Sequence, residues 1–182
     1  MFLLSPSICL TLLAAATSFK SNTKLSSSGI ISGITWLIDG NNLMGHRGTP
    51  KTADAVATKL QAIRSDDTVV FVLDGQKDGG QEETMVTKNP ENDRFRQVSL
   101  GQGISADDYI LEQIQNALQA FETENVKAKI QVVTADRLLR RKALEAKPIV
   151  RQVINPVTFW KRYLPRLSGL KLPKLSDQQE EL

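Results

Sequence analysis

The chain has 182 residues, enough for one domain with a real hydrophobic core, and its apolar (41%) and charged (24%) fractions are those of ordinary globular proteins. It contains one cysteine and one histidine, which excludes a Cys/His zinc site and an intrachain disulfide. Cys–His catalysis is excluded as well, because Cys9 lies in an N-terminal segment that we expect to be removed. The plentiful reactive group is carboxylate, with 20 Asp and Glu residues, and the formal net charge is +3.

The first 33 residues have the composition of a targeting sequence. Residues 1–18 are apolar and end in small residues, while residues 17–33 are rich in Ser and Thr and contain two lysines and no acid. The apolar stretch is too short for a membrane span. A signal-like segment followed by a transit-like segment, with Phe19 near the junction, resembles the bipartite plastid presequence of algae with complex plastids. We therefore expect a mature plastid protein without a membrane segment; the alternative is a secretory signal and a secreted protein.

The rest of the chain alternates between predicted strands and helices. Apolar, β-rich runs predict strands at residues 34–38, 68–73, 95–100, 129–134 and 149–154. Helical spacing of apolar residues, or an Asn-Pro start, predicts helices at residues 52–63, 105–122, 137–146 and 156–163. Residues 76–93 are polar and are expected to form a loop, and residues 164–182 are expected to form a disordered tail.

This order of elements predicts an α/β fold, a three-layer α/β/α sandwich with a mostly parallel sheet, over residues 34–163. Continuously apolar runs such as residues 69–73 (VVFVL) favour strands that are buried on both faces. In such sheets, ligands bind beyond the carboxyl ends of the strands. Candidate functional residues are therefore sought where the predicted strands end.

Carboxylates stand at those ends. Three predicted strands are followed by an aspartate, at Asp39, Asp74 and Asp136. Because the carboxyl ends of parallel strands share one edge, these side chains are expected to converge. Asp107 lies four residues before Leu111 on the apolar stripe of the 105–122 helix and is expected to point toward the sheet. Asp108 continues the polar stripe and is expected to be more exposed.

Each aspartate taken alone also fits a turn or a helix start. Taken together they predict a cation site, because two like charges 4 Å apart repel by about 4 kcal/mol at an effective dielectric constant near 20. Carboxylate and water ligands favour Mg²⁺ or Mn²⁺.

Charge is distributed unevenly along the chain. Residues 66–124 contain 13 acids and four bases, whereas residues 137–174 contain eleven bases and one acid. An acidic centre beside a basic flank predicts a cation site next to a polyanion-binding surface; a solvated basic helix face with a basic tail gives the same counts. The candidates to hold phosphates are Arg137, Arg140 and Arg141. His46 is a further candidate contact to a phosphate, although a lone loop histidine more often has no such role.

The chain carries, in this order, the segments WLIDGNNLMG, VVFVLDG, GISADDYILEQI and VVTADR. Together they resemble the PIN-like nucleases, and more narrowly the NYN branch that includes the bacterial YacP-type ribosome-associated endoribonucleases. The resemblance covers roughly residues 34–160. It implies a PIN-like fold, metal-dependent cleavage of single-stranded or structured RNA with Mg²⁺ or Mn²⁺, and RNA and the ribosome as partners.

The resemblance also implies roles for individual residues. The implied catalytic set is Asp39, Asn42, Asp74, Asp107, Asp108 and Asp136. The implied metal ligands within it are Asp39, Asp107 and Asp136, with Asn42 supporting the first of them. Ala135 stands where the family pattern often has a serine. A metal held by these carboxylates would lower the pKa of a bound water that attacks a phosphodiester.

Two other functions stay open. The first is an RNA-binding module of the same fold that does not cleave RNA. The second is a Mg²⁺-dependent phosphatase, but that chemistry usually uses a nucleophilic aspartate in a DxD arrangement, which Asp39-Gly40-Asn41 does not supply.

Overall fold

The structure is a computed structural model that describes residues 33–63, 66–75, 83–90, 92–124 and 127–169. The predicted targeting sequence lies outside the described residues except for Gly33, and so do residues 170–182 of the predicted tail. Within these ranges, no helix combines the length and the apolar character needed to cross a membrane.

The described residues form six strands together with α-helical segments and one π-helical segment, η1. In chain order they are β1 (Thr35–Asp39), α1 (Gly40–Gly45), α2 (Ala53–Gln61), β2 (Thr68–Leu73), β3 (Met85–Asn89), β4 (Asn92–Ser99), α3 (Ala106–Glu124), β5 (Ile130–Val133), α4 (Arg137–Glu145), β6 (Val150–Ile154), α5 (Pro156–Thr158), η1 (Phe159–Tyr163) and α6 (Leu164–Leu167).

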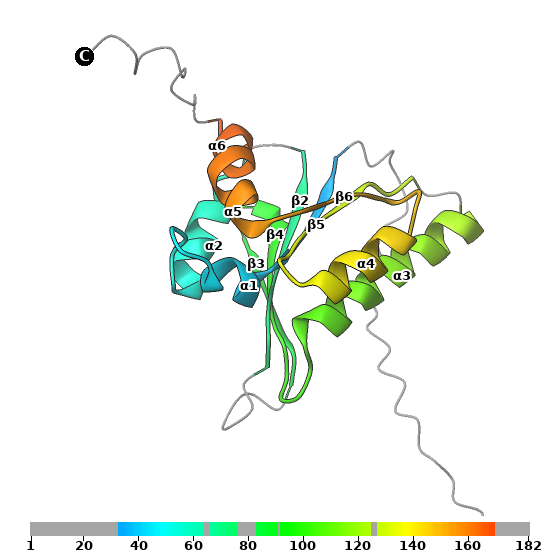
Figure 1. The fold of residues 1–182 in the computed structure, drawn as a ribbon, viewed down its shortest axis with the longest axis horizontal. Helices are drawn as coiled ribbons and strands as arrows, with labels where there is room; N and C mark the ends of the chain where they lie inside the picture. The colour runs from blue at the N-terminus through cyan, green and yellow to red at the C-terminus, as the bar shows by residue number, and fades with distance from the viewer. Residues whose placement is uncertain (1–32, 64–65, 76–82, 91, 125–126, 170–182) are drawn as a thin grey trace, which may run out of the picture.

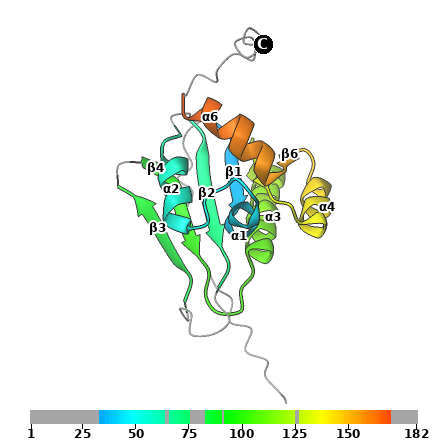
Figure 2. The same ribbon diagram turned by 60° about the vertical axis from the view of Figure 1, so that its left-hand side comes forward.

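The six strands form one sheet in the order β3-β4-β2-β1-β5-β6. β3 pairs antiparallel with β4, and all other neighbours are parallel. Helices α3 and α4 cover one face, and α1, α2 and the α5–α6 segment cover the other (Figures 1 and 2). The predicted α/β sandwich with a mostly parallel sheet is confirmed.

Each face of the sheet has its own core, because successive side chains of a strand point to opposite faces. In β1, Leu37 packs in the core beneath α3 and α4, whereas Trp36 and Ile38 pack in the core beneath α1 and α2. The Trp36 ring also meets the rings of Phe159 (centroids 5.3 Å apart) and Tyr163 (5.8 Å), which fixes η1 against the sheet. The central strands are thereby held from both sides.

Three segments differ from the prediction. The predicted loop at residues 76–93 contains a strand, β3, and β4 begins within it; residues 76–82 lie outside the described residues. The Asp-Gly-Asn-Asn run after β1 forms a short helix, α1. The chain remains helical to Leu167 and Leu164 is buried, so the predicted domain boundary at residue 163 is too early and residues 164–167 are not a disordered tail.

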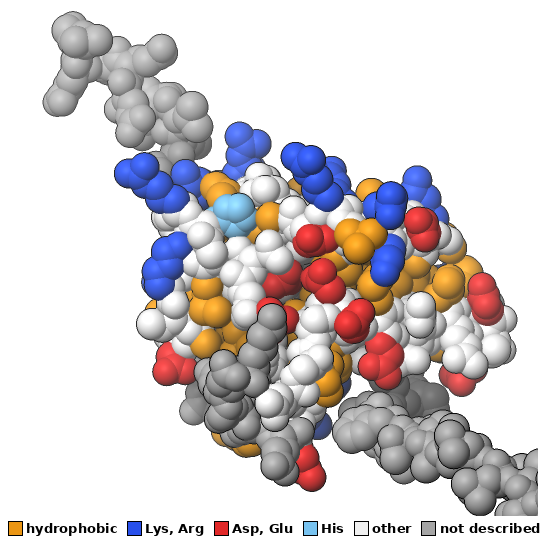
Figure 3. All heavy atoms as spheres, turned by 60° about the horizontal axis from the view of Figure 1, so that its bottom comes forward, with side chains coloured by type: hydrophobic (Ala, Val, Ile, Leu, Met, Phe, Trp, Pro, Cys, Tyr) orange, Lys and Arg blue, Asp and Glu red, His pale blue; other side chains and the backbone are white. Residues whose placement is uncertain are grey.

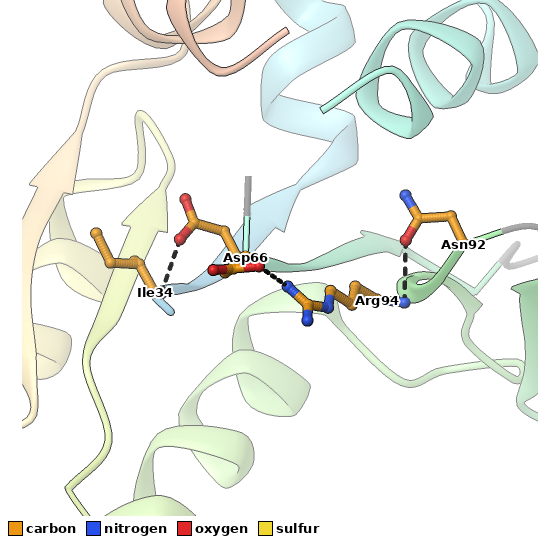
Figure 4. A network of polar contacts seen from close by, with 5 residues as sticks. Ile34, Asp66, Asn92 and Arg94 are labelled. Carbon is orange, nitrogen blue, oxygen red and sulfur yellow. Dashed lines mark hydrogen bonds and ion pairs between the residues drawn. The ribbon is translucent and has the colours of Figure 1, made fainter. Parts of the chain in front are cut away.

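Other acidic residues hold the amino ends of the strands, opposite the predicted site. Asp66 forms an ion pair with Arg94 (2.8 Å), the one salt bridge among the residues that the structure describes (Figure 4). Asp67 accepts hydrogen bonds from the Ile34 backbone N–H and from Nε1 of Trp36, both at 2.9 Å. These two carboxylates tie β1, β2 and β4 together and take no part in the carboxyl-end cluster.

The Gly after Asp39 and the Gly after Asp74 are required by close packing. Neither Gly40 nor Gly75 has a positive φ. A Cβ on Gly75 would lie 1.9 Å from the Gly101 carbonyl oxygen, and a Cβ on Gly40 would lie 2.7 Å from the carbonyl oxygen of Val72. The chain therefore leaves β1 and β2 through backbone contacts that admit no side chain.

We expect Gly75→Ala to lower the free energy of unfolding by about 2–3 kcal/mol, because the new methyl group forces two backbone segments apart. Gly45→Ala is the matched control, since a Cβ there meets nothing within 4 Å; it should change stability by no more than about 0.5 kcal/mol. Urea unfolding curves measure both values. Equal stability of the two variants would mean that the Gly75 contact is not tight.

Candidate functional site

Four aspartates approach one another at the carboxyl edge of the sheet. Asp39 ends β1, Asp74 follows β2 and Asp136 follows β5, and these strands are neighbours in the order β2-β1-β5. Asp107 comes from the first turn of α3. The lower part of Figure 1 comes forward in Figure 3, where acidic side chains gather in the middle of the face.

Asp39 is the buried member of the cluster, with only 2% of its surface exposed. Its Oδ1 accepts a hydrogen bond from the Asn42 backbone N–H (3.0 Å), which caps α1, and its Oδ2 accepts from the Asn42 side-chain amide. The Thr134 hydroxyl donates to the same Oδ2 (3.1 Å). Asn42 therefore supports Asp39, as the resemblance implies, and both oxygens of Asp39 are engaged.

Asp74 is exposed, and it caps a helix that lies far along the chain. Its Oδ1 accepts a hydrogen bond from the backbone N–H of Ala106 (2.6 Å) at the start of α3. Its Oδ2 accepts from the Asn41 side-chain amide (2.7 Å). Asp74 thus fixes the beginning of the helix that carries Asp107 to the end of β2.

Asp136 is half-buried and begins α4. Its Oδ1 accepts hydrogen bonds from the backbone N–H groups of Leu138 (2.7 Å) and Leu139 (2.8 Å). Its own N–H donates to the Thr134 hydroxyl oxygen (3.0 Å), and that hydroxyl also donates to Asp39. Thr134 is therefore a direct link between the ends of β1 and β5.

Asp107 and Asp108 lie on different sides of α3, as the helical phase predicts. Asp107 is half-buried, and Asp108 is exposed. The Asp108 side chain accepts a hydrogen bond from the Ser105 hydroxyl (2.7 Å), and the Asp108 N–H donates to that hydroxyl oxygen (3.1 Å). This pair caps the start of the helix, so Asp108 has the structural role at a helix start that the sequence also allowed.

The charges of the cluster act on one another. The pKa of Asp107 is raised to about 6, first by burial and then by the negative charges of Asp39, Asp136, Asp74 and Asp108. The pKa of Asp39 is also raised, because burial outweighs its hydrogen bonds from Asn42 and Thr134. The negative charges of its neighbours therefore disfavour the ionised form of Asp107, which among the described residues accepts no hydrogen bond that would offset them.

The carboxylate oxygens define where a cation fits. Among the described residues, no donor contacts either oxygen of Asp107 or the Oδ2 of Asp136. In the described ranges, no three Asp, Glu, His or Cys side chains stand close enough together to hold a metal ion. Both oxygens of Asp39 accept hydrogen bonds from Asn42 or Thr134. The donor set does fit a hard cation that keeps several waters and takes one or two carboxylates, as Mg²⁺ does.

Basic side chains flank the acidic cluster. In α4, Leu139 and Ala143 are buried, which leaves Arg137, Arg140 and Arg141 exposed. None of the three forms an ion pair within the described part of the chain. Figure 3 shows Lys and Arg side chains along the margin of the face whose middle is acidic. The predicted basic flank is therefore present as free positive charge.

Asn41, Thr134 and His46 lie near the cluster and were not assigned to its catalytic set from the sequence. Asn41 orients Asp74, and it belongs to the same DGNN run that drew attention to Asn42. Thr134 joins Asp39 to Asp136, a contact across 95 residues that no local pattern reveals. The His46 backbone carbonyl accepts a hydrogen bond from Lys51 (2.6 Å), whereas within the described part of the chain the His46 imidazole makes no polar contact.

Comparisons with protein-family models, with curated proteins and with solved structures find no match for the chain.

We expect Asp107→Asn to stabilise the fold, and to do so more strongly at about pH 8 than at about pH 5. A carboxyl with a raised pKa is protonated in the folded state at low pH, and its ionisation destabilises the fold as the pH rises through about 6. The full shift corresponds to about 3 kcal/mol, which solvent screening of this partly exposed group reduces to the order of 1 kcal/mol.

Thermal melts without divalent cations measure this effect. Asp108→Asn is the control on the exposed side of the same helix and should give a smaller gain. If the advantage of Asp107→Asn over the parent chain is the same at both pH values, ionisation of a buried Asp107 among its acidic neighbours is not its cause.

Proposed function

We propose that this chain is a metal-dependent endoribonuclease that cleaves RNA phosphodiester bonds, similar to the PIN-like NYN nucleases. The observation that carries the proposal is the environment of Asp107, a half-buried carboxylate beside three strand-end aspartates. Among the described residues, no donor engages its oxygens and no acid pairs with the neighbouring arginines of α4. The targeting sequence expected at residues 1–33 would place the activity in the plastid, with RNA, and the ribosome as an RNA-rich assembly, as partners.

The division of hydrogen bonds supports distinct roles within the cluster. Asp107 and Asp136 have oxygens available to Mg²⁺ or Mn²⁺, and Asp39 can add the remaining lone pair of an oxygen that already accepts a hydrogen bond. Asp74 with Asn41 fixes the start of α3, and Asn42 with Thr134 fixes Asp39. When bound, the cation supplies a water of lowered pKa and neutralises charge that develops on the phosphate.

The basic flank supports a polyanionic substrate. The acidic cluster by itself repels phosphate, so binding energy must come from groups around it. The exposed guanidinium groups of Arg137, Arg140 and Arg141 offer charge-assisted hydrogen bonds to phosphate oxygens. Because α4 begins directly after Asp136, these phosphate contacts lie next to the carboxylates. An RNA strand held along α4 would bring one phosphodiester toward Asp107.

A second candidate function is an RNA-binding module without cleavage activity. The observation in its favour is that the described acidic side chains form no group of three metal ligands. The two functions share the basic flank and differ in the role of Asp107. Incubation of the purified full chain with RNA in Mn²⁺, Mg²⁺ or EDTA separates them, because the module binds RNA under all three conditions and cleaves under none.

We expect Asp107→Asn to lower the RNA cleavage rate by at least about 100-fold, since the substitution removes the carboxylate with two free oxygens from the cation site. Asp108→Asn should lower it by less than about tenfold, because Asp108 is exposed and bonded to Ser105. Rates are measured at saturating Mn²⁺. Parent-like cleavage by Asp107→Asn would rule out the nuclease and leave the RNA-binding module.

We expect the double variant Arg140→Ala/Arg141→Ala to bind single-stranded RNA more weakly and with a shallower salt dependence. Two lost phosphate contacts reduce the slope of log K against log salt by about 1.4. Fluorescence anisotropy over a range of salt concentrations measures the slope. Lys59→Ala/Lys88→Ala, which removes two exposed charges from α2 and β3, is the charge-matched control and should leave the slope unchanged.

A further inference from the structure

Few large hydrophobic side chains are strongly exposed among the described residues, and two of them flank the acidic cluster. The exposed set is Met85 (50%), Val86 (51%), Ile104 (43%) and Leu138 (49%). The first two lie on the edge strand β3, three places from β1 in the sheet. Single exposed apolar residues need no explanation, but Ile104 and Leu138 stand at the starts of the helices that carry Asp107 and follow Asp136.

Leu138 is fixed beside Asp136. Its backbone N–H donates to Oδ1 of Asp136 (2.7 Å), and the next residue, Leu139, takes the buried position in α4. The Leu138 side chain therefore points outward, near Arg141 and Lys142, which lie three and four positions along the same helix. An apolar surface thus adjoins both a site carboxylate and exposed positive charges.

Ile104 precedes α3 and is held at the end of β2. Its carbonyl oxygen accepts a hydrogen bond from the backbone N–H of Gly75 (3.2 Å), directly after Asp74. Two residues later, Ala106 donates to the Asp74 carboxylate, and Asp107 follows. Ile104 and Leu138 therefore adjoin different members of the cluster, one at the end of β2 and the other at the end of β5.

Ile104 and Leu138 can contribute binding energy that the negative charge of the acidic cluster does not oppose. A polyanion that approaches the acidic cluster gains energy from the arginines, and it also gains from uncharged contacts that the acids do not oppose. A nucleobase offers such a contact, because its flat faces are apolar. In a duplex those faces are covered by stacking, whereas an unpaired base can turn them toward side chains.

We infer that Leu138 and Ile104 contact unstacked bases on either side of the phosphate that faces Asp107, so that the site takes a single strand rather than a duplex. This inference rests on the proposed binding of RNA at this face. It makes both residues positioning residues: they hold the nucleotides next to the reacting phosphate and take no part in the chemistry.

The test measures binding in EDTA, separately from cleavage. The probe is a labelled single-stranded RNA of about 12 nucleotides, together with versions that lack one base at successive positions. Leu138→Ala and Ile104→Ala should each bind the intact strand about fivefold more weakly than the parent chain, as expected for losing contact of half an apolar side chain. Met85→Ala, with equal exposure on β3, is the matched control and should bind as the parent does.

Base deletion identifies the contact. Removing the contacted base should weaken binding by the parent about as much as the Leu138→Ala substitution does, and should weaken binding by Leu138→Ala no further. The salt slope should stay that of the parent, unlike the slope of the arginine variant. The inference would be overturned if both variants bound RNA as the parent does. It would also be overturned if, at every RNA position, the loss of affinity from base deletion added to the loss from Leu138→Ala. Thermal melts of each variant show that the fold is intact.

Cleavage in Mn²⁺ separates this inference from the proposed function. If the coupling between Leu138 and one base is found while the parent chain does not cleave, the base contact stands and the nuclease is wrong. If the parent chain cleaves and Asp107→Asn does not, while Leu138→Ala and Ile104→Ala bind and cleave as the parent does, the nuclease stands and the base contact is wrong.

Discussion

Hydrogen bonds from helix starts hold like charges together at the end of the sheet. Asp39 and Asp136 each accept from the helix that follows their own strand, and Asp74 accepts from the start of α3. Backbone N–H donors and the positive end of a helix favour the ionised carboxylate and offset part of the repulsion. Asp107 has no such donor among the described residues, and its pKa is raised by its burial and by the repulsion that remains.

The fold was predictable where apolar pattern and burial coincide. Strands β1, β2, β5 and β6 and helices α2, α3 and α4 follow continuous or helically spaced apolar residues. Strand β3 has no such pattern, because Met85 to Lys88 are exposed and pairing alone makes it a strand. Residues 164–167 look like the start of a basic, Pro-containing tail, but Leu164 packs in the core that holds Trp36.

The sequence was sufficient to predict which residues of the site approach one another. Parallel strand ends and the phase of one helix placed Asp107 inward and Asp108 outward. Which oxygens remain free could not be predicted, because it depends on contacts between distant segments. Thr134 reaches Asp39 only because β1 and β5 are neighbours, and Asn41 reaches Asp74 only because β1 and β2 are.

The edge strand β3 is expected to be less stable locally than the central strands of the sheet. β3 pairs only with β4, its register shifts between Lys88 and Asn89, and its side chains from Met85 to Lys88 are exposed. Strands β2, β1 and β5 are covered on both faces and paired on both edges. Backbone amides of β3 are therefore expected to exchange with solvent through local opening, and those of the central strands to exchange more slowly, through larger unfolding events. Asp39, Asp74 and Asp136 stand at the carboxyl ends of these central strands, so the spacing of these three aspartates is expected to persist through fluctuations that release the edge.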